Sequence, residues 1–181
     1  RRSCKGFHLA LVSSNTPIKG LADFVEMSRH LSGAGHSDIH CLLIGPANGH
    51  VDALKEQQAQ GKAPANLRFA GFASSPIDAI AQADVVVNLS HAQESFGRTV
   101  LEAMAAARPV VCYAWGALPE LVIDRETGYL VPLGETHAAA ERVLVLYRDP
   151  DLRRAMGEAA RRRAARDYAE SIFLEKLRSG F

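Results

Sequence analysis

Cysteine is scarce in this sequence, with three among 181 residues, an odd number that does not suggest a disulfide framework. Cys41 and Cys112 fall within apolar runs that are typical of buried strands. We therefore expect reduced, structural thiols, as in a cytosolic protein, with Cys4 as the third. No cysteine and histidine residues stand at the spacing of a zinc site, so no metal centre is expected.

An excess of charge of either sign is also lacking. The formal net charge is +1 at pH 7, which gives no reason to expect a nucleic acid partner. No apolar run is long enough to span a bilayer, and no signal-peptide pattern opens the chain, so a cytoplasmic location is expected. Because the first residue is Arg1 rather than Met, we expect a piece of a larger protein.

Apolar residues are plentiful, at 48% of the sequence, so a chain of this length can build one domain with a full core. Runs that predict strands cover residues 7–12, 39–44, 66–70, 84–89, 110–113 and 128–131. Helical patterns cover 21–31, 51–60, 76–83, 99–107, 136–148 and 151–168, with a short helical segment ending at Val122 and a candidate last helix over 171–177. This alternation predicts an α/β fold, with a parallel sheet of about six strands between two layers of helices.

The candidate site residues all follow predicted strands. Lys19 follows the first strand, Gly45 the second, Gly71 the third, residues 94–97 the fourth and residues 115–120 the fifth. Ligands of parallel sheets bind beyond the C-terminal ends of the strands, so these segments are expected to surround one site.

The most informative stretch runs from Ser90 to Val111. A buried strand ends at Leu89, a polar loop with Gly97 follows, and a helix rich in Ala, Leu, Met and Glu stops at Pro109. The first N–H groups of a helix have no partner inside it, and the helix dipole is positive there, so phosphate binds readily. Gly97 would let the backbone come close to such a ligand.

Two carboxylates flank this turn, Glu94 before it and Glu102 after it. Carboxylates accept hydrogen bonds from hydroxyls rather than binding phosphate, which indicates a ligand with hydroxyls beside phosphates, such as a sugar or a ribose. If the helix begins near Phe96, Arg98 and Glu102 share one face. The side chains expected to turn toward the core are then Val100, Leu101 and Met104.

The motif Glu94-x7-Glu102, inside Glu-Ser-Phe-Gly-x-x-x-Leu-Glu-Ala-Met-Ala and followed by Pro109-Val-Val, resembles the retaining glycosyltransferases of the glycogen-synthase-like family four. The similarity runs from about His8 to about Tyr168. It implies a Rossmann-like three-layer α/β/α domain over residues 1–181, one half of the two-domain GT-B fold. This half would bind a nucleotide diphosphate sugar, and the N-terminal acceptor domain would be absent.

The resemblance also assigns roles to individual residues. Lys19, followed by Gly20, would hold the donor diphosphate, Glu102 the ribose hydroxyls, and Glu94 the hydroxyls of the transferred sugar. Backbone N–H groups of the loop would contact phosphate and sugar, with the Phe96 side chain in the core; the loop residues are Ser95, Phe96 and Gly97. Backbone groups after two further strands would clasp the nucleotide base; these candidates are Gly45, Gly71 and Phe72. Arg98 is a further donor-binding candidate, against the alternative of an exposed helical arginine.

Two departures from the family pattern stand out. Related enzymes usually carry an arginine five or six residues before the lysine, where this sequence has Ser14 and Ser13. A phosphate cation is therefore missing, or Arg98 or Lys5 replaces it. Ala107 stands where relatives usually have glycine.

Three other polar features have two interpretations each. Pro119-Glu120 matches a Pro-Glu that relatives place near the donor, and it also fits helix capping. His91 is interpreted as a loop histidine, against the alternative of a direct role at the site. The arginines between Arg153 and Arg166 form either a solvated helix face or a weak contact with an anionic membrane surface.

The leading hypothesis is therefore the donor-binding half of a retaining glycosyltransferase that moves a hexosyl group to an acceptor sugar, lipid or polysaccharide. No cofactor or metal is expected, because Lys19 and the helix N-terminus would do the work of a cation. The alternatives are a non-catalytic nucleotide-binding module and a sugar-nucleotide epimerase. The expected location is cytoplasmic, with the inner face of the membrane as the site of any peripheral contact.

Overall fold

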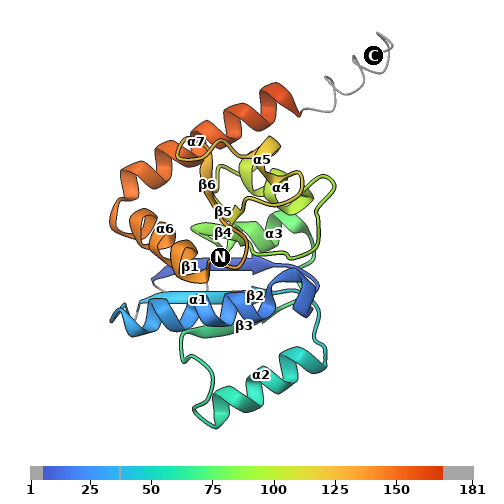
Figure 1. Ribbon diagram of the computed structural model, residues 1–181, viewed down its shortest axis with the longest axis vertical. Coiled ribbons are helices and arrows are strands. Elements are labelled where there is room, and N and C mark those ends of the chain that lie inside the picture. Colours follow the sequence, from blue (N-terminus) through green and yellow to red (C-terminus); the bar gives the residue numbers. More distant parts are fainter. Residues whose placement is uncertain (1–5, 37, 169–181) are drawn as a thin grey trace.

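The computed structural model of the chain describes residues 6–36 and 38–168, and it has the predicted α/β fold (Figure 1). The strands are β1 (Phe7–Val12), β2 (Ile39–Ile44), β3 (Leu67–Gly71), β4 (Val85–Asn88), β5 (Val110–Tyr113) and β6 (Gly128–Val131). They form one six-stranded sheet in the order β3-β2-β1-β4-β5-β6, with every pair parallel. This is the strand order of the doubly wound Rossmann fold.

Most helices fill the connections between consecutive strands, and the last two follow β6. The helices are a 3₁₀ turn η1 (Pro17–Lys19), α1 (Leu21–Gly33), α2 (Gly49–Ala59), α3 (Pro76–Ala81), α4 (Arg98–Ala105), α5 (Leu118–Leu121), α6 (Thr136–Arg148) and α7 (Pro150–Asp167). The predicted helix over 171–177, together with Cys4 and Lys5, lies outside the described residues.

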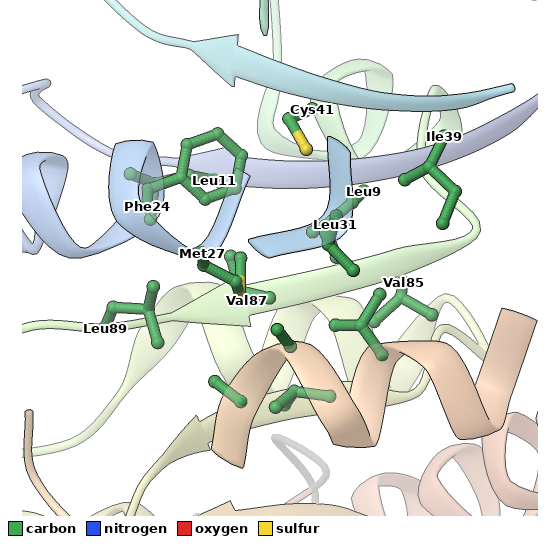
Figure 2. Packing of buried hydrophobic residues seen from close by; sticks show 14 of the residues in the cluster. Leu9, Leu11, Phe24, Met27, Leu31, Ile39, Cys41, Val85, Val87 and Leu89 are labelled. Atoms are coloured by element: carbon green, nitrogen blue, oxygen red, sulfur yellow. The ribbon is translucent and has the colours of Figure 1, made fainter. Parts of the chain in front are cut away.

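Each face of the sheet carries its own hydrophobic cluster. On one face, α1 and α6 pack against the sheet; Figure 2 shows Phe24, Met27 and Leu31 of α1 near Leu9 and Leu11 of β1. On the other face, α3, α4, α5 and the second half of α7 cover the sheet, with Val100 and Met104 of α4 fully buried. The side chains of the central strands are buried in both directions, which explains why these strands are almost uniformly apolar in sequence.

The thiols of Cys41 in β2 and Cys112 in β5 lie in these two clusters and are free and fully buried. Burial raises the pKa of each thiol to about 12. Since the thiolate is the reactive form, both cysteines act as small apolar side chains, as the sequence predicted.

Local signals shift some element ends relative to the predictions. Helix α2 begins two residues early, at Gly49, because Asn48 caps it by accepting hydrogen bonds from the N–H groups of His50 and Val51. Helix α4 begins at Arg98, because Gly97 takes a left-handed conformation with φ of 72°.

The arginines of α7 are largely engaged within the domain. Arg163 donates to the carbonyl oxygens of Leu121 and Glu120, and Arg153 donates to that of Leu146. Three exposed arginines pair with acids on the same helix: Arg154 with Asp151, Arg161 with Glu158, and Arg166 with Asp167. Within residues 6–36 and 38–168, no helix has the length and apolar character needed to cross a membrane.

Candidate functional site

The candidate site lies where the strand order reverses. Strands β1 and β4 are neighbours in the sheet, whereas β2 and β5 continue away from them on opposite sides. The loops after β1 and β4 therefore diverge at this point and leave a crevice at the C-terminal edge. The first loop carries Lys19 and the second carries Glu94, so the topology brings these two predicted residues together.

Direct hydrogen bonds hold these two loops to each other. The backbone N–H of His91 donates to the carbonyl oxygen of Ile18 at 2.9 Å, and the hydroxyl of Ser90 donates to the same oxygen at 3.4 Å. On the other side, the N–H of Ala117 donates to the carbonyl oxygen of Glu94 at 2.9 Å. The loops after β1, β4 and β5 thus form one connected frame.

The side chains of Lys19 and Glu94 form an ion pair inside this frame. The Lys19 Nζ lies 2.7 Å from the Glu94 Oε1, and both side chains are partly buried, with exposed fractions of 33% and 22%. A cation and a carboxylate at this edge match the two chemistries of a phosphorylated sugar, one for phosphate and one for hydroxyl groups.

A small cavity of about 180 Å³ adjoins this pair. It is lined by Lys19, Asn88, Glu94, Ser95, Phe96, Gly97, Arg98 and Thr99. The N-terminus of α4 borders it, and Gly97 provides no side-chain cap, so the first N–H groups of the helix are available to an anion. The predicted residues of the 94–98 stretch are thus brought together with Lys19.

The sequence prediction for the Phe96 side chain is wrong. Phe96 was expected in the core, but it is 50% exposed at the rim of the small cavity. The left-handed Gly97 that follows turns the chain into α4, and a side chain at Gly97 would meet Leu118 and Leu121. The start of α4 therefore packs against these leucines, and the Phe96 side chain remains at the surface.

A larger cavity of about 400 Å³ lies beside the first. Its lining consists of Val12, Ser13, Ile44, Gly45, Pro46, Phe72, Ala73, Ser74, Ser75, Pro76, Ala79, Arg98, Thr99 and Glu102. The predicted residues Gly45, Phe72 and Glu102 all belong to it. Arg98 and Thr99 line both cavities, so the two hollows share a wall at the first turn of α4.

Arg98 and Glu102 stand on one face of α4, as their spacing predicted. The Arg98 Nη2 is 4.0 Å from the Glu102 Oε1. The Arg98 side chain is 81% exposed, so solvent screens this pair and it contributes little to stability. The Arg98 guanidinium can therefore leave this pair and turn toward an anion in either cavity at a small cost in free energy.

The predicted glycines differ in their surroundings. Side chains on Gly20 and Gly45 would collide with the carbonyl oxygens of Leu89 and Ser13, at 2.1 and 1.9 Å, so both allow neighbouring loops to touch. Gly71 has open space around it, and its carbonyl oxygen accepts a hydrogen bond from the N–H of Gly45. Gly20 and Gly71 line neither cavity.

The serines that replace the family's arginine are engaged in their own loop. The Ser13 hydroxyl donates to the Asn15 side chain and accepts from its N–H, and the Ser14 hydroxyl contacts that of Thr16. The Asn48 side chain donates to the carbonyl oxygens of Ser14 and Asn15. Ser13 nevertheless lines the larger cavity, as a polar group without charge.

Two contacts near the site were not predicted from the sequence. The carboxylate of Asp23 on α1 accepts hydrogen bonds from the Tyr113 hydroxyl and the His91 ring.

The candidates Pro119 and Glu120 line neither cavity, and the carbonyl oxygen of Glu120 accepts a hydrogen bond from Arg163.

A third hollow of about 670 Å³ lies between α1 and α2, on the face of the domain away from α4. Its lining contains none of the predicted site residues. Within the described part of the chain, no group of three histidine, cysteine or acidic side chains is close enough to hold a metal ion.

A doubly wound sheet with hollows at its switch point is the architecture of domains that bind ligands beyond the ends of their strands. Over residues 5–163, the chain matches the model of the family described as Glycosyl transferases group 1. The chain therefore belongs to this family, which confirms the resemblance drawn from the Glu94-x7-Glu102 motif.

Similar proteins include the N-acetyl-alpha-D-glucosaminyl L-malate synthase of Bacillus anthracis, 38% identical over 93 residues that cover 51% of this chain and 24% of that protein. The structure of Anabaena HepE in complex with UDP and glucose has a TM-score of 0.81 and 25% identity, over 97% of this chain and 49% of HepE. The chain thus spans less than half of the length of these two relatives. The C-terminal domain of the group 1 protein LpcC from Francisella tularensis has a TM-score of 0.76 and 26% identity, over 91% of this chain and 87% of that domain.

Proposed function

We propose that this chain is the donor-binding half of a retaining glycosyltransferase, which moves a hexosyl group from a nucleotide diphosphate sugar to an acceptor. The observation that carries the proposal is the pair of adjoining cavities at the switch point. Each contains one glutamate of the motif, Arg98 stands on the wall between them, and Lys19 lies in the smaller one. An elongated ligand with hydroxyls at both ends and phosphates in the middle fits this order of groups.

In this proposal the nucleoside occupies the larger cavity, where Glu102 accepts hydrogen bonds from ribose hydroxyls and Phe72 offers an exposed ring beside the base. Backbone groups at Gly45 and Phe72, which line this cavity, complete the base site. The diphosphate and the sugar occupy the smaller cavity, where Glu94 accepts from sugar hydroxyls.

The chemical step breaks the bond between the anomeric carbon and the diphosphate oxygen, which leaves with the electron pair. The acceptor oxygen forms its bond to the same carbon with retention of configuration, and its proton passes to the released diphosphate. Lys19 and the N–H groups at the start of α4 are placed to stabilise the charge that grows on the departing diphosphate. These groups, with Arg98, would neutralise the diphosphate without a metal ion.

The acceptor site belongs, in our proposal, to an N-terminal domain of the whole protein, since the chain spans less than half of its full-length relatives. Residues 1–181 alone should therefore bind donor and transfer poorly. Transfer by this chain at the rate of the whole enzyme would contradict that division.

The proposal is tested by calorimetric titration of the 181-residue chain with UDP, GDP, ADP and their sugar conjugates. One nucleotide should bind, and Lys19→Ala and Glu102→Ala should each weaken it about tenfold or more, the loss expected for a charge-assisted hydrogen bond. Lys55→Ala and Glu158→Ala, which remove surface charges on α2 and α7, should have no effect. A folded chain that binds none of these ligands, or equal losses in the controls, would contradict it.

A non-catalytic nucleotide-binding module is the second candidate, favoured by Ser13 and Ser14 at the position of the usual arginine. Their hydroxyls are engaged within the loop and supply no charge to a phosphate. The two candidates separate on the whole protein, since transfer of a sugar from the bound nucleotide to any acceptor rules the module out.

We further propose a cytoplasmic location, which the free thiols of Cys41 and Cys112 support. Contact with an anionic membrane surface would involve the exposed arginines of α7. Because Arg154, Arg161 and Arg166 already pair with acids, such contact should be weak and should disappear at moderate salt. Sedimentation with vesicles that contain anionic lipid, at low and moderate salt, measures it.

A further inference from the structure

The Asp23 carboxylate joins three elements that surround the candidate site. Asp23 stands in the first turn of α1, four residues after Lys19. Its Oδ2 accepts a hydrogen bond from the Tyr113 hydroxyl at the end of β5 and contacts the His91 Nε2 at 2.7 Å, in the loop after β4. The carboxylate is largely buried, with 18% of the side chain exposed.

Asp23 and His91 are each close in sequence to one residue of the Lys19–Glu94 ion pair. His91 precedes Glu94 by three residues, and its N–H donates to the carbonyl oxygen of Ile18, the residue before Lys19. The ring of His91 also rests edge-on against that of Tyr113, with centroids 5.8 Å apart. A shift of His91 would therefore move the loops of both Lys19 and Glu94.

Tyr113 supplies a fixed point for this arrangement. Its ring is fully buried in the sheet, and burial together with the hydrogen bond to Asp23 raises the pKa of its hydroxyl. The hydroxyl thus stays protonated and donates. Since Asp23, His91 and Tyr113 line neither site cavity, any effect on a ligand there must pass through the loops.

We propose that Asp23 is a positioning residue: by holding His91 against Tyr113, it fixes the loop of residues 94–97 relative to the loop of Lys19, so that Lys19 and the N–H groups at the start of α4 are preset for a diphosphate. This inference rests on the proposed function, because it concerns the same site. It assigns no direct contact with the ligand to Asp23. Its effect should therefore fall on the diphosphate half of the site and spare the nucleoside half, which is built mainly from the end of β2, the segment after β3 and Glu102.

The test measures the affinity of the 181-residue chain for a nucleoside diphosphate and for the matching monophosphate, by calorimetry. The variants are Asp23→Asn, which keeps the size of the side chain, and His91→Phe, which keeps the ring contact and removes the hydrogen bond. The control is Glu26→Ala, which removes a half-exposed acid on the next turn of α1 that pairs with Arg29. Thermal unfolding of each variant checks that it is folded.

In both variants the preference for diphosphate over monophosphate should fall about tenfold, because the loop must now be ordered during binding. The control should keep the wild-type preference. A purely structural role would weaken both ligands together and leave their ratio unchanged, which would overturn the inference.

The outcomes separate this inference from the proposed function. If the wild-type chain binds no nucleotide, the proposed function fails and the positioning role fails with it. If the wild type binds but both variants keep its preference, only the positioning role is overturned. Amide NMR gives a reading without ligand: Asp23→Asn should shift the resonances of residues 18–19 and 91–94, and resonances there that stay in place would overturn the role.

Discussion

Lys19 and Glu94 are 75 positions apart in the chain, yet their charged atoms lie 2.7 Å from each other at the C-terminal edge of the sheet. The cation assigned to the diphosphate is thus paired with the carboxylate assigned to the sugar. A diphosphate that enters the smaller cavity must draw Lys19 away from Glu94 or share it. In our proposal, the pair keeps Lys19 in place and also disfavours anions that bring no sugar hydroxyls to Glu94.

Glu94→Gln should therefore affect two ligands in opposite directions. Removing the carboxylate releases Lys19 and removes a negative charge close to the phosphates, so affinity for a nucleoside diphosphate should rise about fivefold at low salt. The affinity for the sugar conjugate should fall, because a neutral amide accepts hydrogen bonds from the sugar hydroxyls more weakly than a carboxylate does. Calorimetry with both ligands measures this, and a fall in affinity for the diphosphate alone would contradict it.

Ala107→Gly should stabilise the domain. Ala107 follows α4 and has a left-handed φ of 54°, a conformation that favours glycine and costs other residues about 1 kcal/mol. The free energy of unfolding, from urea titration, should rise by about that amount. Ala106→Gly is the matched control, since its φ of −83° suits alanine and glycine there should lower stability. Equal losses in both variants would contradict this explanation of the family's glycine.

Gly157→Ala should destabilise the domain, although alanine is normally the better helix former. A side-chain carbon at Gly157 in α7 would lie 2.2 Å from the carbonyl oxygen of Ala107, so α7 would have to move away from α4. We expect a loss of about 1–3 kcal/mol in thermal or urea unfolding. Gly33→Ala at the end of α1, where the space is open, should be neutral or slightly stabilising. A stabilised Gly157→Ala variant would show that this contact does not limit the packing of α7.

Stability should fall as pH rises above about 9. The pKa of Cys41 and of Cys112 is about 12 in the folded chain, against 9.0 for an ordinary thiol. Above pH 9 the unfolded chain therefore loses protons that the folded chain keeps, which favours unfolding by about 1.4 kcal/mol per pH unit for each thiol. Urea unfolding between pH 8 and 10.5 should show this slope, with a smaller one in the Cys41→Ala, Cys112→Ala double variant. Equal slopes in the two proteins would contradict the role of the thiols.

Much of the fold could be predicted because each strand is short, apolar and bounded by turn residues. β5 and β6 match their predicted ranges, since a proline and a glycine mark their starts and both faces are covered. The family could be predicted from one stretch, because Glu94, Gly97 and Glu102 keep their spacing on one loop and one helix.

The rest of the site depends on contacts that leave no local pattern. Asp23, His91 and Tyr113 come from three distant parts of the chain, and nothing in their spacing marks them as neighbours. The exposure of Phe96 follows from how α4 packs on Leu118 and Leu121, which an apolar residue in a motif does not reveal. The position of Arg98 between the two cavities likewise required the packed structure.

The central claim is that one nucleotide sugar lies across both cavities, and amide NMR of the labelled chain tests it most directly. During titration with the nucleotide sugar that binds, the account predicts shifted resonances in two groups, near Gly45 and Phe72 and near Lys19 and residues 94–98. Titration with the nucleoside alone should shift only the first group. Shifts confined to the hollow between α1 and α2, or to one group with both ligands, would contradict the account.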